Sequence, residues 1–186
     1  MILYETERLI LRQVDDSFAQ QVLAYYERNR DFLTEWEAQK PAEFYTIDVQ
    51  RLNLRRDIEI FARGDSLKLW IFKKVDNDYS NVIGCITFSL ITRGIFQSCF
   101  VGYKLDQGQL NQGFVTEALR KAIEVMFKDF GLHRIEAPIM PRNKASIKVA
   151  EKLGFENEGL SRKMLKVNGI WEDHIRWVLL NEHEQE

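Results

Sequence analysis

The most regular pattern of hydrophobic positions in the chain lies between residues 115 and 130. Apolar side chains recur there every three or four residues, at Val115, Ala118, Leu119, Ala122, Ile123, Met126, Phe127 and Phe130. This spacing places them in one stripe along a helix, and the glycine at 131 is typical of the position after a helix end. The pattern predicts a long amphipathic helix with one face packed against a core.

The middle third of the chain has a different pattern. β-Branched and aromatic residues are concentrated in three runs, at 66–75, 82–92 and 96–105. Arg93-Gly94, between the second run and the third, is typical of a turn. We therefore predict three consecutive strands connected as a meander.

Shorter patterns of the same two kinds fill the ends of the chain. Patterns typical of strands are found at 7–12, 134–139, 160–167 and 171–180. Helical spacing is found at 18–26, 47–61 and 147–153. Asn168-Gly169, between the last two strands, is a strong hairpin signal. Strands and helices are thus mixed along the chain, so we expect one α/β domain over residues 1–186.

Composition limits the class of protein. The 186 residues are 45% hydrophobic and carry a formal net charge of −2. This hydrophobic fraction suits a packed core, and the near-neutral charge argues against direct nucleic-acid binding. Every apolar run is shorter than the roughly 20 residues that a membrane span needs, and the first residues lack the basic and apolar regions of a signal peptide. We therefore expect a cytoplasmic protein that does not bind membranes.

The sulfur and imidazole side chains do not indicate a metal site. Cys85 and Cys99 lie within apolar, strand-like runs, which is typical of buried free thiols in a reducing compartment. The histidines are not spaced from the cysteines as metal ligands are. No metal is predicted.

The start of the long helix is the first candidate for chemistry. A strand ending at Leu105 leads through a short loop into Asn111, Gln112, Gly113, Phe114, Val115 and Thr116. The first N–H groups of a helix have no partner within the helix, and the helix dipole places partial positive charge there. Gly113 has no Cβ, so a diphosphate can approach these donors closely. The segment is a candidate diphosphate loop, although an ordinary strand-to-helix turn can have the same sequence.

A second polar cluster begins the next helix, about thirty residues later. Asn143 and Ser146 have the spacing of an N-cap residue and the position that it caps, and the helix ends in Leu153-Gly154-Phe155. The chain resembles the GNAT superfamily of N-acetyltransferases in the order of these features: a strand, a phosphate loop, an amphipathic helix, a second strand and an Asn-x-x-Ser motif. The ordered combination is far more specific than either motif alone.

Within that superfamily the chain resembles the Rim group of ribosomal-protein-alanine N-acetyltransferases, and its RimJ members most. The resemblance extends over nearly the whole length and includes residues 6–12, 32–36, 82–89, 93–96, 102–103, 133–135 and 173–174. It implies acetyl transfer from acetyl-CoA to a primary amine, with the N-terminal alanine of a ribosomal protein as the expected acceptor. It also implies the GNAT fold, a mostly antiparallel sheet of seven strands splayed between the fourth and the fifth, with about four helices.

The resemblance also implies roles for individual residues. Acetyl-CoA is expected to contact Tyr103, Lys104, Leu105, Leu110, Asn111, Gln112, Gly113, Phe114, Val115, Thr116, Asn143 and Ser146. Asn143 is expected to hold the pantetheine arm, and Ser146 either protonates the leaving thiolate or is a further pantetheine contact. Glu35, beside Trp36, is either a residue of the amine side or a solvated surface carboxylate. The oligomeric state is left open between monomer and homodimer.

The chain departs from the family pattern in ways that bear on mechanism. Leu110 and Val115 replace the usual first and last residues of the phosphate loop, but the donors there come from the backbone, so we still expect diphosphate binding. Pro138 stands where some N-terminal acetyltransferases carry a glutamate base, so the general base is not identified. An α-amine needs little help, because its pKa is about 7.7–8.0, against about 10.4 for lysine.

Two other functions stay open at this point. An acetyltransferase for a polyamine or an aminoglycoside would favour acidic residues that converge on a cationic acceptor, and Glu35, Glu37 and Asp173 are the candidates. A CoA-binding sensor without catalysis is the other alternative, and the presence of Gly113 together with the Asn143 motif argues against it.

Overall fold

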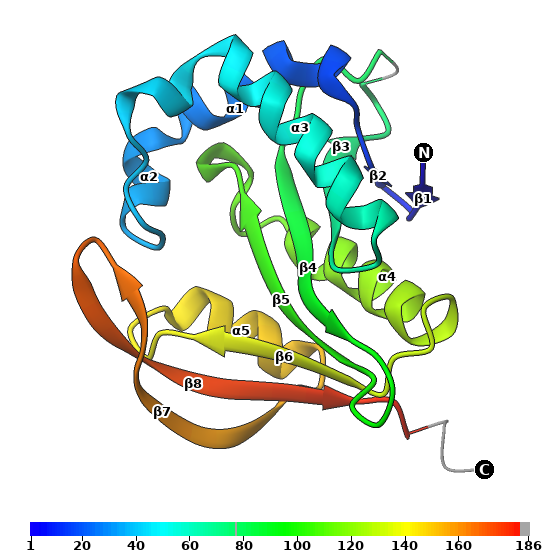
Figure 1. Cartoon of the computed structure of the whole chain (residues 1–186), viewed down its shortest axis with the longest axis vertical. Coiled ribbons are helices and arrows are strands. Elements are labelled where there is room, and N and C mark those ends of the chain that lie inside the picture. Colours follow the sequence, from blue (N-terminus) through cyan, green and yellow to red (C-terminus); the bar gives the residue numbers. More distant parts are fainter. Residues whose placement is uncertain (77, 183–186) are drawn as a thin grey trace.

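The computed structural model describes residues 1–76 and 78–182, so residue 77 and the last four residues of the domain predicted over 1–186 lie outside it. In the described part, eight strands form one sheet in the order β1-β2-β3-β4-β5-β6-β8-β7 (Figure 1). The strands are β1 (Leu3–Glu5), β2 (Leu9–Arg12), β3 (Leu67–Lys73), β4 (Gly84–Thr92), β5 (Ser98–Leu105), β6 (Arg134–Ile139), β7 (Glu156–Val167) and β8 (Ile170–Leu180). The α-helices are α1 (Ala19–Arg28), α2 (Arg30–Thr34), α3 (Ile47–Ala62), α4 (Phe114–Lys128) and α5 (Lys144–Lys152).

The pairing of β5 with β6 differs from that of all the other neighbouring strands. It is parallel, whereas the others are antiparallel, and it joins only residues 98–100 of β5 to residues 134–136 of β6. β5 continues to Leu105 and β6 to Ile139 without pairing further with each other, and Figure 1 shows the two strands diverging. The splay expected between the fourth and fifth predicted strands is therefore confirmed.

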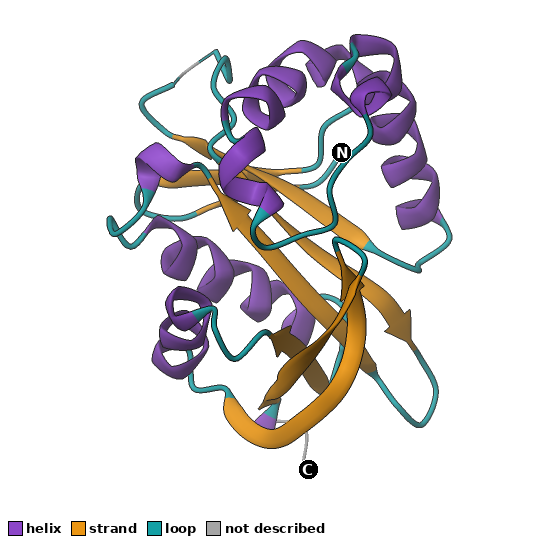
Figure 2. Ribbon diagram, turned by 90° about the vertical axis from the view of Figure 1, so that its left-hand side faces the viewer, coloured by secondary structure: helices purple, strands orange, loops and turns teal. Residues whose placement is uncertain are grey.

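Helices cover both faces of the sheet (Figure 2). Along β3, Trp70 and Phe72 pack with α1 and α3, whereas Leu69 and Ile71 belong to the core beneath α4 and α5. This alternation follows from the two-residue period of a strand. Most of the predicted apolar stripe of α4 is buried, with Ala118, Ala122 and Met126 fully inaccessible to solvent. The mixed α/β fold predicted from the sequence is confirmed.

The sequence did not predict two short elements. β1 makes the sheet eight-stranded rather than seven-stranded, by pairing Leu3 with Arg12 of β2. Its three residues are partly exposed and too few to show alternation. α2 has only five residues, less than two helical turns, so no hydrophobic period can reveal it.

Two further expectations concern the thiols and the membrane. Cys85 and Cys99 are free and buried, as predicted. Within the described residues, no helix has both the length and the apolar composition that a membrane crossing requires.

Candidate active site

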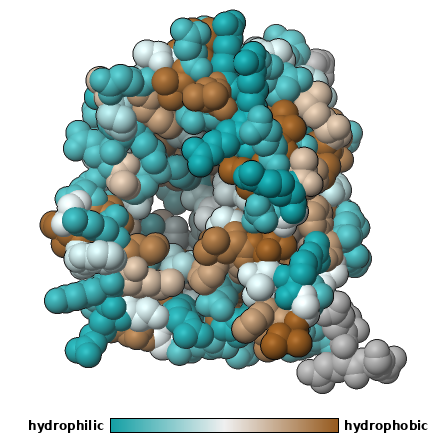
Figure 3. Space-filling model, in the orientation of Figure 1, coloured by the Kyte–Doolittle hydropathy of each residue, from teal (hydrophilic) through white to brown (hydrophobic). Residues whose placement is uncertain are grey.

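A cavity of about 620 Å³ lies where β5 and β6 separate. Tyr103 and Ser146 line it from the side of α4 and α5, whereas Cys85, Lys104 and Glu37 line it from the side of α1–α3. Figure 3 shows the molecule hollowed between the α1–α3 layer and the β7–β8 hairpin. Because the sheet is open between β5 and β6, the cavity can bring together two molecules that enter from opposite faces.

The edge of β5 that faces this gap carries backbone donors. Asp106 donates its N–H to the carbonyl oxygen of Ile83, next to β4, at 2.7 Å. In an antiparallel pair such bonds recur at every second residue. The N–H groups of Tyr103 and Leu105 therefore point away from β4 and toward the gap. A donor in that position can polarise a carbonyl group held in the cavity.

The first turn of α5 brings polar groups to the same place. The side-chain oxygen of Asn143 accepts the N–H of Ser146 at 3.1 Å, which confirms the predicted N-cap. The Ser146 hydroxyl has no hydrogen-bond partner among the described residues, and both residues line the cavity. Tyr103 donates its hydroxyl to the Ser146 carbonyl at 3.1 Å, and burial raises the pKa of Tyr103 to about 12. Tyr103 thus fixes the start of α5 against β5 and stays protonated at neutral pH.

The predicted diphosphate loop lies beside the cavity, which Leu110 and Val115 line from either end of the loop. Gly113 is the N-cap residue of α4 and has a φ of 79°, in the left-handed region that favours glycine. Among residues 1–76 and 78–182, no side chain caps α4, and a Cβ at position 113 would meet only Arg8 within 4 Å, at 3.4 Å from its Nη2. The first N–H groups of α4 are therefore open to an anion.

Arg8 is a functional candidate that the sequence did not reveal. Its guanidinium donates to the Gln112 carbonyl at 3.0 Å and to the Glu117 carboxylate at 2.6 Å. Thr6 also donates to Glu117, at 2.6 Å. Burial alone would raise the pKa of Glu117, but the hydrogen bonds from Thr6 and Arg8 lower it. The ionised Glu117 therefore holds a positive charge beside the diphosphate loop.

On the side of α1–α3, one carboxylate is shared by two lysines. Glu37 accepts a hydrogen bond from Lys104 and lies 3.6 Å from the ammonium of Lys40. Burial alone would lower the pKa of Lys104, but the acidic groups around it outweigh this effect and raise it. These groups are Tyr26, Cys85 and Glu37, and the Glu37 carboxylate also accepts the hydrogen bond that Lys104 donates. Lys104 is therefore an ammonium at neutral pH and cannot serve as a base.

Glu35, the carboxylate expected on the amine side, does not line the cavity and is exposed. Phe32, Leu33, Trp36 and Glu37 line it instead. Phe32 and Trp36 are four residues apart, and so are Leu33 and Glu37. Across the end of α2 and the turn after it, this spacing places them on one side. Glu35 is thus a solvated surface carboxylate, the second of the two alternatives left open for it, and Glu37 is the acidic residue of this turn that lines the cavity.

The three acidic residues that a cationic acceptor would favour do not converge. Of Glu35, Glu37 and Asp173, only Glu37 lines the cavity, and it is paired with lysines. Asp173 accepts the N–H of Lys163 at 2.8 Å, within the β7–β8 hairpin.

The β7–β8 hairpin closes one side of the cavity, to which it contributes His174 and residues 165–167. Asn168, in its turn, accepts the N–H of Gln39 at 2.6 Å and donates to the carbonyl of Thr34 at 2.8 Å. These two bonds join the hairpin to the end of α2 and the loop after it. His174 is buried, and its Nδ1 lies 3.0 Å from the carbonyl oxygen of Glu172.

The structure thus divides the predicted cofactor-binding residues into two groups. The residues that line the cavity are Tyr103, Lys104, Leu105, Leu110, Val115, Asn143 and Ser146. The others form the loop and the first turn of α4, and they are Asn111, Gln112, Gly113, Phe114 and Thr116. The sequence did not reveal the contacts of Arg8 with Glu117, of Glu37 with Lys104, and of the hairpin with the loop after α2, because each joins segments that are far apart along the chain.

Comparisons with known proteins agree with this geometry. The family model of the acetyltransferase (GNAT) domain matches residues 8–156. A probable N-acetyltransferase of Bacillus subtilis, YjcK, is 34% identical over 96% of this chain and 97% of its own length. The [ribosomal protein uS5]-alanine N-acetyltransferase of Escherichia coli is 35% identical over 94% of this chain and 88% of its own. The crystal structure of the ribosomal-protein-S5-alanine acetyltransferase of Vibrio fischeri superimposes with a TM-score of 0.91 at 33% identity, over the full length of both chains.

Proposed function

Because the chain belongs to the GNAT family and is an acetyl-CoA-dependent N-acetyltransferase, we propose that it acetylates the N-terminal alanine of a ribosomal protein. The names of the E. coli and V. fischeri relatives support this acceptor. Whole-length similarity to both supports it further, because the residues that surround the amine come from several distant segments of the chain.

The cavity and the loop beside it fit acetyl-CoA. The open N–H groups around Gly113, with the guanidinium of Arg8 beside them, suit its diphosphate. Asn143 and the free edge of β5 suit its pantetheine arm, which carries amide groups. Acetyl-CoA supplies the acetyl group as a thioester.

The residues of the chain then act on the two reacting groups. The N–H groups of Tyr103 and Leu105 are donors for the acetyl oxygen, where negative charge develops during attack. The amine nitrogen bonds to the acetyl carbon as the carbon–sulfur bond breaks, and the departing sulfur takes a proton. Ser146 lines the cavity, its hydroxyl has no hydrogen-bond partner within the described part of the chain, and we propose that it gives that proton.

The amine must be neutral when it attacks. An α-amine has a pKa about one unit above neutral, and the nearby Lys104 ammonium favours the uncharged form further. A lysine side chain would need several units of help. His174 lines the cavity, and its imidazole is the candidate that takes the proton lost by the amine, directly or through water.

The charge of the amine side is the observation that carries the proposal against a small cationic acceptor. Lys104 and Lys40 flank Glu37 there, so the carboxylate is already neutralised. A polyamine or an aminoglycoside would meet positive charge without a free carboxylate to balance it, whereas a peptide N-terminus brings a single amine.

A panel of acceptors tests the proposal. Peptides that begin with alanine, a peptide with an internal lysine and a blocked N-terminus, spermidine and an aminoglycoside are assayed for thiol release from acetyl-CoA. We expect the largest kcat/KM for the alanine peptides at pH 7. A larger value for spermidine or for the aminoglycoside would refute the proposal and favour the small-amine alternative.

A further inference from the structure

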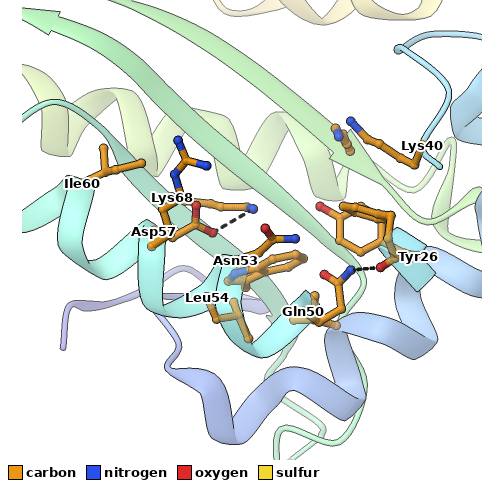
Figure 4. A pocket seen from close by; sticks show the side chains of 13 residues that line it. Tyr26, Lys40, Gln50, Asn53, Leu54, Asp57, Ile60 and Lys68 are labelled. Carbon is orange, nitrogen blue, oxygen red and sulfur yellow. Dashed lines mark hydrogen bonds and ion pairs between the residues drawn. The ribbon is translucent and has the colours of Figure 1, made fainter. Parts of the chain in front are cut away.

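A second cavity, of about 360 Å³, lies between α3 and the sheet (Figure 4). Gln50, Asn53 and Asp57 of α3 line one side of it, and Lys68 and Trp70 of β3 line another. The loop around Lys40 and the short 3-10 helix η2 (Ala42–Tyr45) border it as well. Its size falls within the range of small ligand sites in proteins.

The two cavities meet at Lys104, whose side chain lines both of them. Lys104 faces Cys85 of β4 in the sheet register, and Cys85 faces Trp70 of β3. The three residues therefore form a row across the sheet on the α1–α3 face. The second cavity continues along this row from the amine side of the active site.

Positive charge is in excess around the second cavity. Four cationic residues line it, namely Lys40, Arg56, Lys68 and Lys104. In the described part of the chain, two carboxylates balance them. Asp57 lies 3.0 Å from Lys68, and Glu37 is shared by Lys40 and Lys104. Four positive charges thus face two negative charges, in a chain whose formal net charge is −2.

The packing holds this charge in place. Lys68 lies 4.7 Å from the ring centroid of Trp70, and Lys40 lies 5.6 Å from that of Phe44. Such contacts orient an ammonium without neutralising it. Arg56 has no ion pair or hydrogen bond among the described residues. Among the described residues, Arg56 therefore adds a positive charge that no carboxylate balances.

We propose that this second cavity is a subsite for a side-chain carboxylate of the acceptor, so that the enzyme selects N-termini with an acidic residue a few positions after the acetylated one. The proposal rests on the proposed function, because it takes the acceptor to be a peptide. A carboxylate would complete the pairing of Arg56 and the lysines, and Asn53 offers an amide donor within the same lining.

The sheet gives the expected position of the acidic residue. Two strand spacings separate Lys104 from Trp70, a distance of about 10 Å. An extended peptide advances about 3.3 Å per residue. If the α-amine lies beside Lys104, the third or fourth residue of the acceptor reaches β3, the strand that carries Trp70 and Lys68. An acidic residue is therefore expected at one of these two positions.

Matched peptides test the subsite. Three sets begin with the same alanine and differ only in having Glu, Gln or Lys at position three or four. The wild-type enzyme is expected to prefer a Glu peptide by about tenfold in kcat/KM, mainly through KM, with the preference falling as salt is added. Arg56→Gln should remove most of the preference, and Arg56→Glu should shift it toward a Lys peptide. Arg51→Gln is the matched control, because Arg51 lies on α3, is exposed and does not line the cavity.

The outcomes separate this proposal from the proposed function. Equal kcat/KM for the Glu and Gln peptides would overturn the subsite and leave N-terminal acetylation intact. A preference that Arg56→Gln leaves unchanged, with thermal melting also unchanged, would overturn it as well. Turnover of spermidine without turnover of any peptide would instead refute the proposed function. The affinity of the CoA-bound enzyme for each peptide, measured by calorimetry, gives a second readout that does not depend on catalysis.

Discussion

Replacing Gly113 with aspartate tests the assignment of the diphosphate loop. The new carboxylate would stand at the first turn of α4, where the open N–H groups would otherwise hold phosphate oxygens. The φ of 79° at this position strains most side chains, but aspartate and asparagine tolerate it better than others do. Gly113→Asn is therefore the matched control, since it has nearly the same shape without the charge.

The size of the effect follows from Coulomb's law. Two unit charges about 5 Å apart repel by about 0.8 kcal/mol in bulk water and by about 3 kcal/mol at an effective dielectric constant of 20. Gly113 is exposed, so the lower part of this range applies to each charge. A diphosphate carries more than one charge, but the guanidinium of Arg8, only 3.4 Å from the new Cβ, offsets part of the repulsion. We expect acetyl-CoA to bind at least tenfold more weakly to Gly113→Asp than to Gly113→Asn.

Calorimetric titration of acetyl-CoA into each variant gives the two affinities, and thermal melting checks that both variants fold. The ratio of the two dissociation constants for acetyl-CoA should fall as salt is added, because salt screens a repulsion that acts at an exposed site. Equal affinities of the two variants would refute the assignment of the diphosphate to this loop, even if both variants bound acetyl-CoA more weakly than the wild type.

Local patterns predicted the parts of the fold that lie within one stretch of chain. α4 has a hydrophobic stripe of four turns, and its observed start at Phe114 lies one residue from the predicted one. The Asn143 cap was predicted because the capping side chain and the N–H group that it accepts, that of Ser146, are three residues apart. β1 and α2 contain three and five residues, so their periods cannot be read from the sequence.

The same limit explains which site residues the sequence revealed. The loop of Gly113 and the Asn143 motif are each contiguous, so each has a signature. The pair of Lys104 and Glu37 joins residues 67 positions apart, and Arg8 meets Glu117 across 109 positions. No spacing rule relates such residues, and only the packing of the α1–α3 layer and of β2 brings them together.

The choice between Glu35 and Glu37 shows how finely position matters. Two residues separate them, but the turn after α2 directs only Glu37 into the cavity. The sequence has one acidic residue on each side of Trp36, and it gives no information about which of the two faces inward. The second cavity was likewise beyond sequence analysis, because its cationic residues are distributed over a loop, α3, β3 and β5.

Three further substitutions test the site. Gly84→Ala would place a Cβ 2.4 Å from the Lys104 carbonyl oxygen, and urea unfolding should show a loss of about 2 kcal/mol or more. Asn168→Gly keeps a residue suited to the turn (φ 49°) but removes both bonds to the loop after α2. The KM for an acceptor peptide should rise several-fold, while calorimetry shows an unchanged affinity for acetyl-CoA. Ser146→Ala decides between two roles. If the hydroxyl protonates the departing thiolate, kcat should fall by about 100-fold with little change in acetyl-CoA affinity. This factor is at the low end of the rate enhancement that a general acid usually gives, because a CoA thiol is a good leaving group. If Ser146 only contacts pantetheine, the KM for acetyl-CoA should rise and kcat should stay. Tyr103→Phe is the comparison, since it removes the bond that fixes Ser146 and retains the serine hydroxyl. The loss of kcat in Tyr103→Phe should be smaller than in Ser146→Ala. An unchanged kcat in Ser146→Ala would contradict the assignment of the acid to Ser146, and changes below threefold in both kcat and the KM for acetyl-CoA would leave Ser146 as part of a helix start alone.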